Sequence, residues 1–346
     1  MGYGLAGSVF HAPLISATPG MTLATVVTSN AERAERARLA HPEARVVDRV
    51  DAIWDAARDH DLVVVATANR AHVPVATAAL DAGLDVVVDK PMAPTSDAAR
   101  QLVALARARG HMLTVFNNRR WDGDMLTVQR LLHEGAVGEV TRMESRFERW
   151  QPRPRPDSWR LQGDPAEAGG VLFDLGSHLV DQAMVLFGGP ERVYAEVQRR
   201  RAMVEADDDV FIALEHPGGI RVHLWASAVA AQQGPRFRLL GMRGAYVKNG
   251  LDGQEDALRA GARPDGPGWG LEPPERWGRL VGDGGERQVE TEPGAYPRFY
   301  QAVAEALRTG APPPVDPLDG IAVIEVLEAA RQSARASSVI ELVAAR

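Results

Sequence analysis

The sequence contains no cysteine, which excludes disulfide bonds, thiolate metal sites and a cysteine nucleophile. It has no apolar run near the ~20 residues of a membrane-spanning helix and no charged-then-apolar secretory segment at its start. Basic residues are not in excess, since 39 Lys and Arg stand against 46 Asp and Glu, for a formal charge of −7. That balance argues against a nucleic-acid or acidic-membrane surface. Composition therefore favours a cytoplasmic enzyme that uses a cofactor.

The chain of 346 residues is long enough for two domains. In its first third, short β-branched runs alternate with Ala-rich stretches. Continuous apolar runs are typical of strands buried on both faces of a parallel sheet. We expect strands at residues 23–27, 62–66, 86–88 and 112–116, with crossover helices at 31–40, 71–82 and 96–109. This alternation predicts a doubly wound α/β, Rossmann-type dinucleotide-binding domain over residues 1–118.

Residues 119–346 have a different pattern, with polar and apolar positions interleaved at 139–149 and 191–247. Such alternation is typical of a sheet with one exposed or partner-covered face, which is mostly antiparallel. Residues 261–285 are rich in Gly and Pro and predict a long surface excursion. Two helices are expected near 295–309 and 317–334. We therefore predict a second, substrate-binding α/β domain with a large open sheet.

A glycine-rich loop lies at the very start of the sequence. Gly2, Gly4 and Gly7, with Leu5 and Ala6 between the last two, fit G-x-G-x-x-G and precede a helix predicted from Ser8. Such glycines permit a tight turn and let a pyrophosphate approach the helix N-terminus. A chain with 33 glycines also matches this pattern by chance. The strand expected near residues 22–28 favours the dinucleotide interpretation, because that fold requires loop, helix and strand in this order.

One part of the dinucleotide fold is missing from the sequence. The fingerprint normally follows a buried strand in the middle of the sheet, and here the chain starts at the loop itself. Without that strand, two neighbouring strands lose hydrogen-bonding partners. We expect the natural start to lie a few residues upstream; the alternative is a truncated, damaged protein.

The residues after the second expected strand bear on the choice of cofactor. An NAD site usually has a carboxylate there to bind the ribose hydroxyls. This chain instead has Ser29 and Asn30, with Arg33 one turn later. Small polar groups and an Arg suit the 2′-phosphate of NADP better. The alternative is an ordinary capped helix with a solvated Arg.

Two further motifs carry groups suited to proton transfer. Asp89-Lys90-Pro91 ends a strand at the edge where α/β sheets bind ligands, and Lys90 could lower the pKa of a substrate hydroxyl. Asp174 and His178 are four residues apart and would share one face of a helix. His is suited to proton exchange near neutral pH, and the carboxylate could orient it. A surface Lys and a helical Asp–His pair are the plain alternatives. No metal ligand stands near the pair at a suitable spacing, so we predict no metal site.

Polar residues at other expected strand ends complete the candidate set. Thr67, Asn69 and His72 could contact the ribose or nicotinamide, although Asn69 could equally cap a helix. The cofactor-binding candidates are Gly2, Gly4, Leu5, Ala6, Gly7, Ser29, Asn30, Arg33, Thr67, Asn69, His72, Asp89 and Lys90. The substrate-binding candidates are Asn118, Arg120 and Trp159.

Taken together, these motifs resemble the Gfo/Idh/MocA family of NAD(P)-dependent sugar and polyol oxidoreductases over essentially the whole chain. Ala68 and Asp89 depart from the family's usual Thr-Pro-Asn and Glu-Lys-Pro. The resemblance implies a nicotinamide-binding Rossmann domain and a C-terminal sheet through whose face copies assemble. It further implies that Lys90 and His178 flank the reacting carbinol and that Asp174 orients the substrate.

Longer strings at residues 7–14, 117–122 and 251–259 are similar to the NADP-dependent scyllo-inositol dehydrogenase branch. That branch often has an Arg where this chain has Asn30. The resemblance implies a cytoplasmic homo-oligomeric dehydrogenase for a cyclic polyol or sugar, with no nucleic-acid or membrane partner. The rivals are a dehydrogenase of the same fold for another sugar or diol, and a non-catalytic nucleotide-binding regulator.

Overall fold

The computed structural model describes residues 1–154, 161, 163–202 and 204–342. These residues divide into two compact units. The first comprises Met1–Asn118, Gln254–Trp269 and Ala295–Ile321, and the second comprises Arg119–Gly253, Gly270–Gly294 and the residues from Ala322 onward. The division after Asn118 lies at the predicted boundary, but the first unit also includes two later segments. Aromatic packing accounts for the last of these segments, since the ring of Phe299 lies 4.9 Å from that of Phe116.

Parallel strands form the core of the first unit. Strand β1 pairs with β2, and a separate sheet has the order β3-β4-β5. The bounds are Thr25–Val27 (β1), Arg45–Val47 (β2), Leu62–Val65 (β3), Asp85–Asp89 (β4) and Leu113–Phe116 (β5). The four predicted strands are confirmed to within two residues. Strand β2 was not predicted, because three residues that begin with an exposed Arg45 form no apolar run.

The crossover helices of the first unit are also confirmed. The bounds of helix α5 could be predicted because residues typical of helix ends stand at both of them. Thr95 caps its start by accepting a hydrogen bond from the Ala98 amide, and Gly110 ends it with a φ of 73°. The helices of this unit are η1 (Ala6–His11), α1 (Ala12–Ser16), α2 (Ala31–Ala40), α3 (Asp51–Trp54), η2 (Ala57–Asp59), η3 (Asn69–Ala71), α4 (His72–Asp81), α5 (Ser96–Arg109), α9 (Gln254–Arg259) and α10 (Pro297–Thr309). The helix predicted from Ser8 begins at Ala6 as the π-helical segment η1.

The first two residues lie between β1 and β3. The Gly2 amide donates to the Val27 carbonyl at 3.0 Å, and the Met1 carbonyl accepts from the Ala66 amide at 2.9 Å. These bonds are made at the carboxyl ends of the two strands. Along the rest of β1 and β3 the described residues contain no strand that joins the two sheets.

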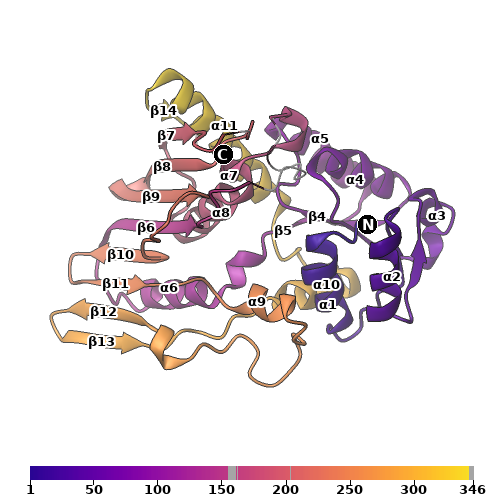
Figure 1. Ribbon diagram of the computed structural model, residues 1–346, viewed down its shortest axis with the longest axis horizontal. Helices are drawn as coiled ribbons and strands as arrows, with labels where there is room; N and C mark the ends of the chain where they lie inside the picture. Colours follow the sequence, from indigo (N-terminus) through magenta and orange to yellow (C-terminus); the bar gives the residue numbers. More distant parts are fainter. Residues whose placement is uncertain (155–160, 162, 203, 343–346) are drawn as a thin grey trace. The chain divides into compact units, whose positions relative to one another are not determined.

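A large sheet dominates the second unit. In the described residues it has nine strands in the order β13-β12-β11-β10-β6-β9-β8-β7-β14, which can be followed from bottom to top in Figure 1. The bounds are Val140–Glu148 (β6), Arg192–Gln198 (β7), Asp209–His216 (β8), Ile220–Ser227 (β9), Phe237–Gly241 (β10), Gly244–Lys248 (β11), Gly278–Gly282 (β12), Gly285–Val289 (β13) and Ile340–Glu341 (β14). Neighbouring strands are antiparallel except for β6 and β9, which confirms a mostly antiparallel sheet.

The prediction of a surface excursion over residues 261–285 is wrong in its last part. Strands β12 and β13 form a hairpin there that extends the sheet at β11. The glycine content predicted a loop here, but these glycines lie at the ends of strands: they begin and end β12 and begin β13. Here pairing with a neighbouring strand outweighs the low strand preference of glycine.

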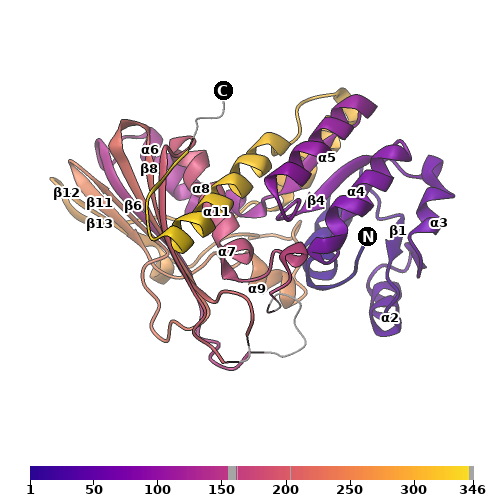
Figure 2. The same cartoon turned by 90° about the horizontal axis from the view of Figure 1, so that it is seen from above.

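Helices pack against one face of this sheet. Helix α8 contacts β6 and β9, and α7 contacts β8. Figure 2 shows α7 and α8 on one side of the sheet. The helices of this part of the chain are η4 (Asn118–Trp121), α6 (Gly123–His133), η6 (Pro165–Glu167), α7 (Val171–Asp174), α8 (Gly176–Phe187), η7 (Pro217–Gly219), η8 (Pro274–Arg276) and α11 (Pro317–Ala336). No single described helix has the length and apolar character of a membrane span; one bent pair, Pro165–Asp174 with Gly176–Phe187, does by length and composition.

Candidate functional site

The glycine loop is packed so closely that two of its glycines leave no room for a side chain. A Cβ atom on Gly2 would lie 2.4 Å from the Ala66 carbonyl oxygen, and Gly2 has a φ of 88°. A Cβ atom on Gly7 would lie 2.1 Å from the carbonyl oxygen of Gly2. The chain therefore requires glycine at both positions to turn from residue 2 into the helix that begins at Ala6.

Gly4 differs from these two glycines. Among the described atoms, a Cβ on Gly4 would have one neighbour within 4 Å, the Arg33 Nη1 atom at 3.8 Å. The next residue, Leu5, is exposed. The loop is therefore open on the side where Arg33 lies, next to the first amides of a helix. This arrangement fits a dinucleotide, because its pyrophosphate needs a close approach to backbone amides.

Asn30, predicted to bind the cofactor, also caps a helix. Its side-chain oxygen accepts a hydrogen bond from the Arg33 amide at 2.9 Å, so Asn30 is the N-cap of α2. Ser29 and the cap are both exposed. The helix cap that was weighed as the alternative is therefore observed. The start of α2 that it caps carries Arg33, whose Nη1 atom lies beside the glycine loop.

His72 lies between two strand ends. Its Nδ1 faces the Pro91 carbonyl at 2.8 Å and its Nε2 faces the Thr67 carbonyl at 3.3 Å. Burial lowers the pKa of His72, so the ring stays neutral near pH 7. A neutral imidazole has one N–H, so it donates a hydrogen bond to one of these two carbonyls, and the ring lies between the loop after β3 and the loop after β4. Asn69 is buried beside it in η3.

Lys90 lies at the carboxyl end of β4, where open α/β sheets bind ligands. Its amide donates to the carboxylate of Asp89 at 2.9 Å. Both side chains are half-buried. The Asp89 carboxylate thus fixes the backbone from which the Lys90 side chain projects.

In the second unit, the premise that Asp174 and His178 share one helix is wrong. Helix α7 ends at Asp174 and α8 starts at Gly176, and the helical stretch Pro165–Asp174 is bent by 62° from α8. Leu175 stands at the break with a φ of −106°, outside the usual helical range. The two side chains therefore lie on either side of a helix break. His178 is buried, with its ring 6.2 Å from that of Phe147, and Asp174 is half-buried.

Arg120 forms an ion pair that was not predicted from the sequence. Its Nη2 and Nε atoms lie 2.6 and 2.9 Å from the two carboxylate oxygens of Asp181 on α8. Asp181 follows His178 by three residues and so lies on the same face of α8. That spacing was the available signal. Asn118 is buried in the first unit, and Trp159 lies outside the described residues.

The described residues contain no group of three or more His, Asp or Glu side chains that could hold a metal ion. The predicted independence from a metal stays a prediction.

Comparison with known proteins identifies the family. Residues 1–117 match an oxidoreductase family by its NAD-binding Rossmann fold, and residues 129–342 match the C-terminal alpha/beta domain of the same family. The chain is 41% identical over 339 residues to the uncharacterized oxidoreductase YdgJ of Escherichia coli, which covers 97% of this chain and 95% of that protein.

The chain is also 36% identical over 346 residues to IolW of Bacillus subtilis, a scyllo-inositol 2-dehydrogenase (NADP(+)), with 99% of this chain and 94% of that protein covered. The solved structure of YPO2259 from Yersinia pestis has a TM-score of 0.92 at 38% identity and covers 99% of this chain and 96% of that one. The chain therefore belongs to the Gfo/Idh/MocA family of NAD(P)-dependent oxidoreductases.

Proposed function

We propose that this dehydrogenase uses NADP to oxidise a secondary hydroxyl of a cyclic polyol similar to scyllo-inositol. The observation that carries the proposal is the guanidinium of Arg33 beside the open face of Gly4. It favours a cofactor with a 2′-phosphate, because a guanidinium binds phosphate through charge-assisted hydrogen bonds. The substrate class is supported by the identity to the inositol dehydrogenase IolW over 99% of the chain.

In the proposed reaction, His178 takes the proton of the substrate hydroxyl. The ammonium of Lys90 lowers the pKa of that hydroxyl by stabilising the developing alkoxide. Nicotinamide supplies the hydride chemistry at its C4 atom. Asp174, Asn118 and Arg120 orient neighbouring hydroxyls, and the pairing of Arg120 with Asp181 limits the rotamers that its guanidinium can adopt.

The cofactor proposal is tested by fluorescence titration of the chain with NADPH and with NADH. Arg33→Ala should weaken NADPH binding by about tenfold or more and leave NADH binding unchanged, since one charge-assisted phosphate contact contributes ~1.5–3 kcal/mol. Arg38→Ala is the matched control, because Arg38 lies on the same helix and pairs with Glu35. Equal losses for both cofactors would contradict the assignment of Arg33 to the 2′-phosphate.

The substrate proposal is tested with NADP⁺ and a panel of scyllo-inositol, myo-inositol, a hexose, a hexuronate and an acyclic diol, read as reduced-cofactor absorbance. We expect the highest kcat/KM for an inositol. A preference for the hexose or the diol would keep the dehydrogenase and change its substrate. Tight NADPH binding without turnover of any compound would favour the regulatory alternative.

We also propose that copies of the chain assemble through the face of the large sheet opposite α8. On that face the half-buried rings of Phe211 and Trp225 lie 5.1 Å apart, and the Arg146 guanidinium stacks 3.9 Å from the Trp225 ring. Clustered aromatic and Arg side chains are typical of interfaces. Light scattering should show an oligomer that Trp225→Glu dissociates. Leu39→Glu, at an exposed site of the first unit, should leave the mass unchanged.

A further inference from the structure

Helix α8 holds two consecutive residues of the segment before α6. Asp181 binds the guanidinium of Arg120, and the Nε2 atom of Gln182 donates to the backbone carbonyl of Arg119 at 2.7 Å. Both contacts begin one turn after His178, on the same helix. The position of Arg120 relative to His178 is therefore determined by how these two residues of α8 hold residues 119 and 120.

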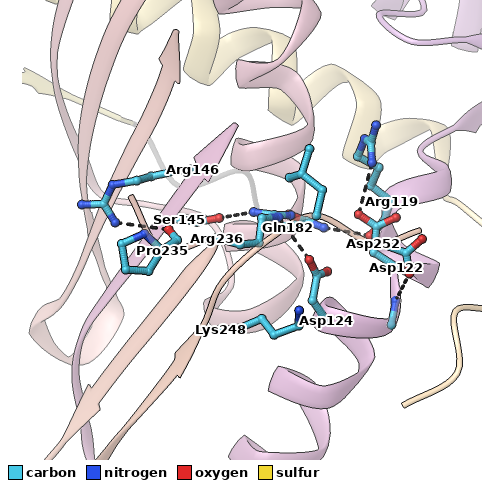
Figure 3. A network of polar contacts seen from close by, with 12 residues as sticks. Arg119, Asp122, Asp124, Ser145, Arg146, Gln182, Pro235, Arg236, Lys248 and Asp252 are labelled. Carbon is cyan, nitrogen blue, oxygen red and sulfur yellow. Dashed lines mark hydrogen bonds and ion pairs between the residues drawn. The ribbon is translucent and has the colours of Figure 1, made fainter. Parts of the chain in front are cut away.

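The orientation of Gln182 depends on Arg236, which lies next to the start of β10. The Arg236 Nη2 atom donates to the Gln182 Oε1 atom at 2.6 Å. A guanidinium has donors and no acceptor, so the oxygen of the carboxamide must face Arg236. The amino group then points to the Arg119 carbonyl, as Figure 3 shows. Arg236 thus determines that the amino group of Gln182, and not its oxygen, faces the Arg119 carbonyl.

Arg236 is held in place from several sides. It is 2% exposed, its Nη1 donates to the Ser145 hydroxyl at 2.5 Å, and its Nε lies 3.2 Å from the fully buried Asp124 carboxylate. The carboxylate compensates the buried charge, which on its own would be costly. A side chain with this many partners has little rotamer freedom.

A second connection runs from Arg236 to His178 through an aromatic ring. The Arg236 guanidinium stacks 4.0 Å from the centroid of Phe147, and the His178 ring lies 6.2 Å from the same centroid in an edge-on arrangement. The guanidinium of Arg119 lies 4.8 Å from that ring as well. Phe147 therefore lies against both His178 and the segment that carries Arg120.

We propose that Arg236 is a positioning residue for the dehydrogenase reaction. Through Gln182 it sets the backbone of Arg119 and Arg120, and through Phe147 it sets the ring of His178. The buried Arg236–Asp124 pair thereby links the proposed proton acceptor His178 to the proposed substrate-orienting Arg120, and both Arg236 and Gln182 are buried. This inference rests on the proposed function, since the roles of His178 and Arg120 belong to it.

The sharpest test changes Gln182, because Gln182→Glu keeps an oxygen for Arg236 and removes the donor to the Arg119 carbonyl. We expect a rise in KM for the polyol and a fall in kcat/KM of tenfold or more. The Kd for NADPH should stay within twofold, because the glycine loop and Arg33 belong to the first unit. Ser145→Ala is the matched control: it removes a partner of Arg236 that does not contact Arg119, and kcat/KM should stay within twofold.

Arg236 itself is tested by the double variant Arg236→Met with Asp124→Leu, which removes both buried charges and leaves none unpaired. We expect a folded chain, judged by thermal melting and NADPH binding, with KM raised and kcat lowered as in Gln182→Glu. Wild-type KM and kcat in either folded variant would overturn the proposal. A kcat that falls only in proportion to the fraction of unfolded protein, with KM unchanged, would overturn it as well. A wild-type chain inactive toward every polyol would instead defeat the proposed function.

Discussion

In the first unit the candidate functional groups belong to short stretches of the sequence, whereas in the second unit they come from segments far apart in the chain. The glycine loop, Arg33 and Lys90 each belong to a local motif with backbone constraints of its own. By contrast, His178 packs against Phe147 of β6, and Gln182 on the same helix contacts Arg119 of η4 and Arg236, which precedes β10. A local motif can be recognised from its spacing, while an assembly of distant segments depends on how the sheet and helices pack.

The largest effects are expected from the two groups proposed to act on the reacting hydroxyl, Lys90 in the first unit and His178 in the second. Lys90→Ala and His178→Ala should each lower kcat by about 10²–10⁴-fold, the usual contribution of a positioned acid or base. The Kd for NADPH should change little. Steady-state kinetics with the best polyol, paired with NADPH titration, checks both. Near wild-type turnover in either variant would remove that residue from the mechanism.

The packing of the glycine loop predicts the next largest effect. Gly7→Ala should destabilise the fold by about 4 kcal/mol and abolish NADPH binding, because the new Cβ would meet the Gly2 carbonyl oxygen at 2.1 Å. Gly4→Ala has room for its Cβ and should reduce NADPH binding with little change in stability. Gly189→Ala is the control, since no described atom lies within 4 Å of its Cβ position. Urea unfolding separates the three; equal stability of Gly4→Ala and Gly7→Ala would refute the packing argument.

One buried histidine in each unit predicts a loss of stability in acid. Burial lowers the pKa of His11 and of His216 from the ordinary 6.5 to about 4. Below pH 6.5 the unfolded chain binds these protons while the folded chain does not. Their stabilisation is therefore complete above pH 6.5 and is lost as the pH falls toward 4.

The size of this effect can be measured at His216, whose ring Nδ1 lies 2.9 Å from the Gly188 carbonyl. Between pH 6.5 and pH 5 it should account for about 2 kcal/mol of the unfolding free energy. His216→Gln keeps a donor for Gly188 and cannot be charged, so its urea midpoint should depend less on pH. An unchanged pH dependence would show that His216 does not couple folding to protonation.

The smallest effect concerns the cap of α2. Asn30→Ala should lower stability by about 1 kcal/mol, as should Thr95→Ala at the cap of α5. Asn30→Asp retains the cap, so stability should hold while the new carboxylate weakens NADPH binding relative to NADH. Urea unfolding and the two titrations check this. If Asn30→Asp left the cofactor preference unchanged, the residue would serve α2 alone.

Much of the first unit could be predicted because its signals are local. The four strands were visible as apolar runs, and α5 was delimited by a capping Thr95 and a terminal Gly110. Strand β2 was missed because its side chains are exposed or half-buried, so nothing in its composition distinguishes it from a loop. Asp181 was missed because its partner, Arg120, lies 61 residues earlier in the chain.

Sequence by itself indicated the family, through the resemblance of its motifs, and it predicted the Rossmann strands and the glycine loop. It also supplied Lys90, Asp174 and His178 as candidate residues. The strands and the glycine loop follow from steric limits and side-chain chemistry that act within a few residues. Tertiary structure alone decided that a helix break separates Asp174 from His178, that the His72 ring lies between two backbone carbonyls, and that Arg236 orients Gln182. The physical reason is that a buried polar group must find its partner wherever the fold brings one, at a separation in sequence that no local pattern encodes.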